Sequence, residues 1–248
     1  MLYNDTSGGQ GLVQDAEDLT GLGDGAISGN STLLKTFTRY MNQWYLKAIA
    51  WLLESNPYWK WDDSNYTDFP EGTTDLVADQ KDYELPVAAS GDNASTFLKL
   101  QELTVLDASG NESPLVHTTE KESVLNEQYP TSGLPKFYKL VNKSVKVWPS
   151  PNASNTTLTD GFKVYYQRTP DLFKTTDTTQ EPGIPSLYHR ILSMGASYDY
   201  SIIHNPDIAS ALRGELSVME QGLKSFHAQA NQDDRINIVP RAARENYN

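Results

Sequence analysis

The stretch from Glu181 to Ala230 contains the longest uninterrupted helical periodicity in the chain. In its first half, apolar residues recur every three or four positions along one face: Leu187, Ile191, Met194, Tyr198 and Ile202. The opposite face is also apolar: Tyr188, Leu192, Ala196, Tyr200 and Ile203. A helix that is apolar on both sides presents little polar surface to water, so this pattern predicts a central helix that begins near Pro185.

The tripeptide His204-Asn205-Pro206 interrupts this pattern and predicts the start of a second helix. Asn is a good helix cap, Pro is favoured at the first helical position, and a carboxylate such as that of Asp207 is stabilised at the positive end of the helix dipole. The following apolar residues form a single stripe: Ile208, Leu212, Leu216, Met219, Leu223, Phe226 and Ala230. The charged residues face away from it: Arg213, Glu215, Glu220 and Lys224. We therefore expect an amphipathic helix, packed on one side, that forms a hairpin with the first.

A third helix is predicted near the N-terminus, where Ser31 or Thr32 can act as its cap. Its apolar positions again follow the helical period: Leu33, Phe37, Tyr40, Met41, Trp44, Ala48, Trp51 and Leu52. The helix should end before Pro57, because proline disfavours helical geometry in the residue that precedes it.

The segment from Tyr58 to Asp63 is rich in aromatic and acidic residues. Trp59 and Trp61 could stack on a sugar, with Asp62 and Asp63 as acid and base. Glycoside hydrolysis, however, needs two carboxylates held across the scissile bond, whereas adjacent carboxylates point in different directions. The simpler interpretation is that the aromatic side chains seal the end of the helix and the aspartates face water.

Between Thr73 and about Arg168 the helical period gives way to the alternation typical of strands. The candidate strands are residues 82–87, 97–106, 115–117, 137–141, 144–148 and 162–168. Turns are predicted at residues 107–111 and at 141–144, where Asn142 can adopt the left-handed conformation. Residues 149–161 are polar and are expected to form an exposed loop. This pattern predicts a small antiparallel barrel or sandwich inserted between the helices.

The first thirty residues are rich in Gly, Asp and Ser. The run from Gly21 to Gly25 does not fit a phosphate-binding loop, because no apolar strand precedes it, no Lys follows it at P-loop spacing, and Asp24 would repel phosphate. A flexible arm or extended loop is therefore expected at residues 1–30.

After Ala230 the helical period is lost, and apolar and basic residues are interspersed in the tail: Arg235, Ile236, Ile238, Val239, Arg241 and Arg244. Two interpretations remain open, a solvated tail and a short strand with arginines that docks on a partner.

Together these patterns predict an α+β fold, in which a bundle of one N-terminal helix and a C-terminal helix hairpin carries the inserted β domain. The expected domains are an N-terminal arm (1–30), a helical domain (31–72 and 170–230), the β domain (73–169) and a C-terminal docking tail (231–248).

Composition and motifs argue against an enzyme and against a DNA-binding protein. The absence of cysteine excludes disulfides, thiolate metal sites and thiol catalysis. The four histidines form no zinc motif, no nucleophile elbow is present, and no calcium loop is found, so we expect no catalytic residue, metal or cofactor. The net charge of −12 disfavours a large nucleic-acid footprint. No segment is long and apolar enough to cross a bilayer, so a soluble protein is expected.

The order of these parts resembles the head-to-tail adaptor proteins of tailed bacteriophages, also called head-completion or tail-tube protein A. The resemblance covers roughly residues 31–240. It rests on the early aromatic helix with Trp44 and Trp51, the aromatic stretch Trp59-Lys60-Trp61, and the β region that opens near Tyr83-Glu84-Leu85-Pro86. The most specific part is the sequence Pro185-Ser186-Leu187-Tyr188-His189, which follows a Tyr-Tyr-Gln-Arg-Thr-Pro strand end and leads into a helix rich in small residues and tyrosine.

The resemblance implies a structural virion protein at the head–tail junction, assembled in the host cytoplasm and without catalysis. It implies a ring of twelve copies, bound to the portal protein on one side and to the next neck or tail protein on the other, through which genomic DNA passes without specific binding. The portal-docking elements would be residues 206–230 and the tail residues Arg235, Ile236, Ile238, Val239, Arg241 and Arg244. The β region would face the tail or a neighbouring subunit. The alternatives are a carbohydrate-binding or depolymerising tail protein that uses Trp59 and Trp61, or another neck component such as a stopper.

Overall fold

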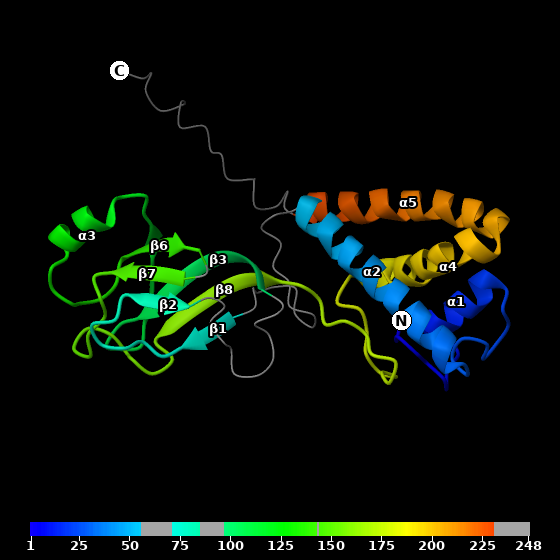
Figure 1. Cartoon of the computed structure of the whole chain (residues 1–248), viewed down its shortest axis with the longest axis horizontal. Helices are drawn as coiled ribbons and strands as arrows, with labels where there is room; N and C mark the ends of the chain where they lie inside the picture. Colours follow the sequence, from blue (N-terminus) through cyan, green and yellow to red (C-terminus); the bar gives the residue numbers. More distant parts are fainter. Residues whose placement is uncertain (56–70, 85–96, 143, 231–248) are drawn as a thin grey trace, which may run out of the picture. The chain divides into compact units, whose positions relative to one another are not determined.

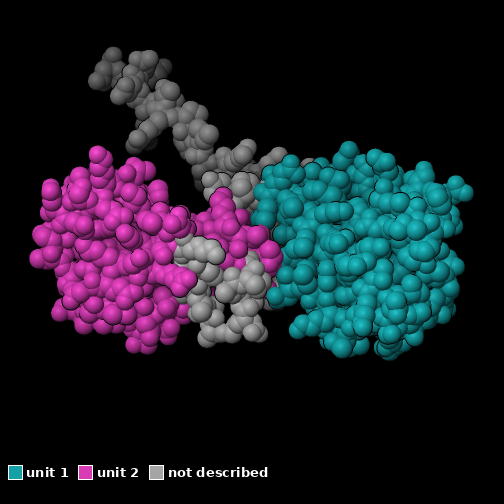
Figure 2. All heavy atoms as spheres, in the orientation of Figure 1, with its two compact units in different colours: residues 1–59, 170–248 teal, residues 60–169 magenta. Residues whose placement is uncertain are grey.

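The computed structural model describes residues 1–55, 71–84, 97–142 and 144–230 (Figure 1). The chain forms two compact units, one made of residues 1–59 and 170–248 and the other of residues 60–169 (Figure 2). The first is helical and the second contains two β-sheets, so the predicted α+β class is confirmed.

The helical unit is organised around helix α4 (Arg190–His204), which contacts α1 (Leu12–Thr20), α2 (Ser31–Ser55) and α5 (Pro206–Ala230) (Figure 1). The buried face of α4 is made of small and apolar residues: Ile191, Leu192, Ser193, Met194, Gly195, Ala196, Ser197 and Ser201. Small residues let α2 approach closely: a Cβ added to Gly195 would stand 2.2 Å from the indole ring of Trp44. The Trp44 ring also donates a hydrogen bond to Asp199, at 2.9 Å, which ties α2 to α4.

The predicted central helix is therefore real, but its start and its burial differ from the expectation. A 3-10 turn, η1 (Ser186–Tyr188), precedes α4, which begins at Arg190 rather than near Pro185. Ile202 is 50% exposed and Ile203 is 72% exposed, so α4 is not buried on both sides, and Leu187 of η1 is 75% exposed.

The other two predicted helices are present. In α5 the expected stripe faces inward through Leu212, Leu216 and Leu223, which are buried. Helix α2 is capped by Asn30 rather than by Ser31 or Thr32, because the Asn30 side chain accepts hydrogen bonds from the backbone N–H groups of Thr32 and Leu33 at 3.0 and 3.2 Å.

The expectation of a flexible arm at residues 1–30 is wrong. This stretch contains α1, whose side chains Leu12, Val13 and Ala16 are fully buried, and Tyr3 stacks on Phe173 at 4.7 Å between ring centroids. Gly21, Gly23 and Gly25 have positive φ in the loop that follows α1, and this loop donates backbone hydrogen bonds to the buried carboxylate of Glu17.

The described part of the β unit contains two four-stranded sheets. The first has the order β1-β8-β3-β4, all antiparallel, with strands β1 (Glu71–Thr74), β3 (Phe97–Leu106), β4 (Glu112–Pro114) and β8 (Phe162–Arg168). The second has the order β2-β7-β6-β5, with strands β2 (Asp82–Glu84), β5 (Val116–His117), β6 (Phe137–Val141) and β7 (Ser144–Trp148). The β5–β6 pair is parallel, so the unit is not purely antiparallel as predicted.

Both sheets contribute to one apolar core: Leu76, Tyr83, Leu103, Val105, Leu115, Val145, Val147, Phe162, Val164 and Tyr166. The predicted bounds of β3, β6, β7 and β8 are confirmed, and Asn142 has the expected positive φ. The sequence analysis missed β1, β4 and helix α3 (Glu122–Gln128). Residues 149–161 are not a wholly exposed loop, because Pro149, Ser150 and Thr156 are buried.

Candidate interaction surfaces

The tail residues predicted to dock on a partner lie outside the described residues: Arg235, Ile236, Ile238, Val239, Arg241 and Arg244. The aromatic stretch with Trp59, Trp61, Asp62 and Asp63 also lies outside them.

His189 anchors the start of α4 through both of its ring nitrogens. Its Nε2 lies 2.7 Å from the carbonyl oxygen of Ile184, and its Nδ1 lies 2.7 Å from the backbone nitrogen of Met1. Because a carbonyl oxygen only accepts, Nε2 donates and Nδ1 accepts, which describes a neutral ring. Burial lowers the pKa of His189 below its ordinary value and favours this neutral form. Both ring nitrogens are thus engaged in a structural contact.

One helical turn further along, Ser193 donates a hydrogen bond to the carboxylate of Asp15, which also pairs with Arg190 at 3.3 Å. These bonds join α1 to α4. The imidazole of His189, already bonded on both sides, is not a base for Ser193. The sequence could not indicate this contact, since Asp15 lies in the stretch expected to be flexible. Among the described residues, no group of three or more His, Asp or Glu side chains is placed to hold a metal ion.

Helix α5, the predicted portal-facing helix, exposes a mixed apolar and charged surface. Val218 is 71% exposed and Phe226 is 45% exposed. Phe226 lies 5.9 Å from the ring of Tyr188, so the C-terminal half of α5 packs on the turn before α4. Lys224 pairs with Glu220 at 3.0 Å and with Glu54 of α2 at 3.1 Å.

The opposite end of the hairpin also carries exposed apolar side chains. Ile202 is 50% exposed and Ile203 is 72% exposed, directly before the Asn205-Pro206 connection. These two adjacent isoleucines give this end of the hairpin a small exposed apolar surface. These residues were predicted to be buried in the core, so the sequence analysis did not identify them as a surface.

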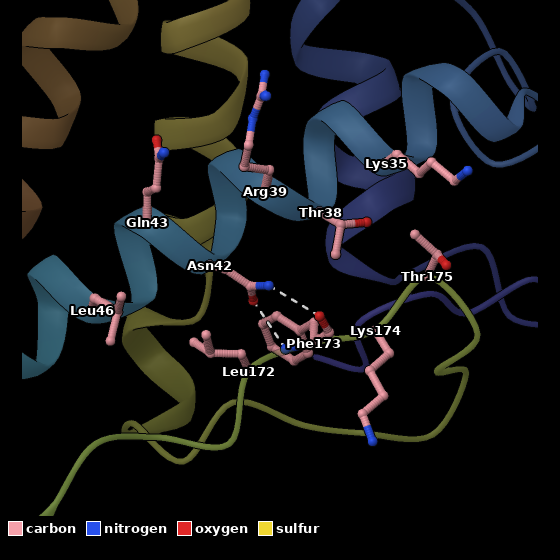
Figure 3. A pocket seen from close by; sticks show the side chains of 10 residues that line it. All are labelled: Lys35, Thr38, Arg39, Asn42, Gln43, Leu46, Leu172, Phe173, Lys174 and Thr175. Carbon is pink, nitrogen blue, oxygen red and sulfur yellow. Dashed lines mark hydrogen bonds between the residues drawn. The ribbon is translucent and has the colours of Figure 1, made fainter. Parts of the chain in front are cut away.

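An open groove of about 560 Å³ runs along α2 (Figure 3). Its other wall is the segment Leu172–Thr175, which Asn42 holds against the helix through two hydrogen bonds of 2.9 Å to the backbone of Phe173. The groove is lined by Lys35, Thr38, Arg39, Asn42, Gln43, Leu46, Leu172, Phe173, Lys174 and Thr175. The lining contains three cationic side chains and no carboxylate, in a chain with a net charge of −12.

No helix within the described ranges is both long enough and apolar enough to cross a membrane.

The sequence model of the family described as SU10 adaptor protein matches residues 11–244, which include the described elements of both units. None of the curated proteins compared with the chain matches it.

Proposed function

Because the chain belongs to the SU10 adaptor protein family, a family of bacteriophage head-to-tail adaptors, we propose that it forms the ring that joins the portal to the tail or neck. In this proposal identical copies, twelve in number, surround the channel through which the genome passes. The protein works at the head–tail junction of the virion, after assembly in the host cytoplasm, and it works by binding and not by catalysis.

The observation that carries this proposal is the extent of the family match. It runs from residue 11 to residue 244 and therefore includes the helical unit, the inserted β unit and most of the C-terminal tail. The resemblance noted in the sequence begins later, near residue 31. The match also includes α1, which the structure describes as a buried part of the helical unit.

The exposed apolar residues of the helical unit support a protein that functions in an assembly. A ring of identical subunits needs two different surfaces on each copy that bind each other head to tail. Ile202 and Ile203 stand at one end of the α4–α5 hairpin, while Leu187 and Phe226 stand near the other end. These are two separate apolar surfaces, one at each end of the hairpin, with Leu187 contributed by η1.

The excess of Asp and Glu over Lys and Arg supports the proposal that the chain lines a channel without holding DNA. Tight binding of a duplex depends on Lys and Arg that displace counterions from phosphates, and this chain has 20 such residues against 32 Asp and Glu. A wall of like charge leaves a polyanion free to slide.

The tail is proposed to supply the portal anchor, with Ile236, Ile238 and Val239 as apolar contacts and Arg235, Arg241 and Arg244 as charged ones. The test is binding of the full chain to the portal ring of the same genome, measured by biolayer interferometry. Replacing the three arginines with glutamate should weaken binding at least about a hundredfold, because each desolvated charge pair at an interface contributes about 1.5 kcal/mol or more.

The matched control reverses three cations of the β unit, Lys99, Lys136 and Lys139, and so produces the same change in net charge. This variant should bind the portal as the parent chain does. Equal loss of binding in both variants would mean that only net charge matters, and it would contradict a specific anchor in the tail.

A further inference from the structure

The groove along α2 has two chemically different ends. Lys35 and Leu46 are eleven residues apart on the helix, which corresponds to roughly 16 Å along its axis. In Figure 3, Lys35, Lys174 and Thr175 lie toward one end, whereas Leu46 and Leu172 lie toward the other. Leu46 is 41% exposed and Leu172 is 42% exposed, so the apolar end is open to a partner.

The cations at this groove have no acidic partner within the described part of the chain. Lys35, Arg39 and Lys174 are exposed, and none of them forms an ion pair with a described carboxylate; Arg39 lies over the ring of Tyr40, at 5.3 Å. By contrast, other lysines are paired, such as Lys146 with Glu122 at 3.0 Å and Lys163 with Glu112 at 2.8 Å. The three charged ends point in different directions in Figure 3 and so offer separate contacts rather than one cluster. Cationic side chains without an ion pair attract anionic groups in a strongly acidic chain.

The dimensions of the groove select an extended peptide. A strand rises about 3.3 Å per residue, so roughly five residues would span the distance from the cationic end to the apolar end. A DNA duplex is too wide to enter a hollow of about 560 Å³, and its phosphates have nothing to offer Leu46 and Leu172. A peptide can complement both ends at once.

We propose that this groove binds an extended acidic segment of a different protein, with carboxylates against Lys35, Arg39 and Lys174 and an apolar side chain against Leu46 and Leu172. The bound sequence would place one or two acidic residues three or four positions from a leucine-like residue. The origin of the segment, a neighbouring protein of the same virion, rests on the proposed adaptor function, whereas the preference of the groove for an acidic peptide does not.

The test measures fluorescence anisotropy of labelled pentapeptides against the full chain. Two probes contain the same five residues, two glutamates, a serine and two leucines, and differ in whether the glutamates stand at the N-terminal or the C-terminal end. Two further probes have the same sequences with glutamine in place of glutamate. We expect a glutamate probe to bind at least about tenfold more tightly than its glutamine counterpart, since two charge contacts are removed. Raising the salt concentration should weaken the glutamate probe alone.

The variant Lys35→Glu/Lys174→Glu reverses the charge at the cationic end of the groove and should no longer bind the glutamate probe. The control Lys99→Glu/Lys136→Glu has the same net charge, with both changes in the β unit, and should retain it. A probe with lysine in place of glutamate should bind the groove variant and not the parent chain, which also demonstrates that the variant is folded.

Three results would overturn the proposal: equal binding of glutamate and glutamine probes, equal loss of binding in the groove and control variants, or binding of a short DNA duplex that competes with the peptide. Self-association of the chain that disappears in the groove variant would assign the groove to a second copy and overturn the assignment to a different protein. A chain that binds the peptide but not the portal would retain the groove and reject the adaptor function.

Discussion

The loop between α1 and α2 depends on a single buried carboxylate. Glu17 is 2% exposed and accepts hydrogen bonds from the backbone N–H groups of Gly25, Ile27 and Ser28, at 3.0, 2.8 and 2.7 Å. The variant Glu17→Gln should lower the free energy of unfolding by about 2–3 kcal/mol, because an amide has one acceptor oxygen and turns an NH₂ group toward backbone donors. Urea denaturation measures this loss. The matched variant Glu215→Gln, on the exposed face of α5, should change stability by less than about 0.5 kcal/mol; equal effects would contradict the role of Glu17.

Gly195 permits the close contact between α4 and α2. An added methyl group would stand 2.2 Å from Cδ2 and 2.3 Å from Cγ of Trp44, so Gly195→Ala should destabilise the helical unit by about 1–3 kcal/mol. Gly214 of α5 has no atom within 4 Å of the same position, and there the ordinary gain of Ala over Gly in a helix should appear, about 0.5–1 kcal/mol of added stability. Thermal unfolding of both variants measures the two effects. Shifts of the same sign would show that α2 and α4 do not approach as described.

At the level of the elements, the sheet β1-β8-β3-β4 carries a surface charge cluster that makes stability depend on pH. Lys163 of β8 pairs with Glu71 at 3.0 Å and with Glu112 at 2.8 Å, and Tyr165 donates a hydrogen bond to Glu112 at 3.0 Å. The pKa of Glu112 is lowered, chiefly by the hydrogen bond from Lys163. Burial and Glu112 together raise the pKa of Tyr165 to about 12.

Because the pKa of Glu112 is lower in the folded chain than in the unfolded one, its contribution is complete above the unfolded value and is lost as the pH falls through the folded value. The variant Glu112→Gln should therefore be less stable than the parent at pH 7, by about 0.2–1 kcal/mol because the pair is partly exposed, and equal to it near pH 2. Urea titrations at both pH values measure the difference. A gap that persists or widens in acid would contradict the assignment.

The elements that could be predicted are those whose pattern is local. Helices α2 and α5 have apolar residues at helical spacing over 25 residues each, and the bounds of β3, β6, β7 and β8 follow from alternation and turns. Helix α1 was missed because it has only nine residues and is flanked by Gly11 and Gly21, although its buried residues Leu12, Val13 and Ala16 do lie at helical spacing. Strands β1 and β4 were missed because they are short and contain Gly72 and Pro114, which favour turns.

The groove could not be predicted from the sequence either, and the reason is different. Its two walls, at Asn42 and Phe173, are 131 residues apart in the chain and are joined by tertiary contacts, which are two hydrogen bonds and the stacking of Phe173 on Tyr45. Likewise, the exposure of Ile202 and Ile203 depends on where α4 ends relative to α2 and α5, and periodicity alone assigned both residues to the core.

For the molecule as a whole, the membership in an adaptor family explains features that a lone enzyme or a DNA-binding protein would not need. The described part combines a helix hairpin that has exposed apolar residues near both ends, a groove lined by three cationic side chains, and an inserted unit with its own core. The hairpin and the groove offer surfaces to other proteins, and the inserted unit can carry further ones. A protein that joins other proteins requires such surfaces.

The central claim, a ring of this chain on the portal, is tested most directly by native mass spectrometry of the purified chain mixed with the portal ring of the same genome. The account predicts a complex with one copy of the chain for each portal subunit, and loss of that complex when residues 235–248 are removed. A chain whose mass stays that of a free monomer beside an unchanged portal ring would contradict it.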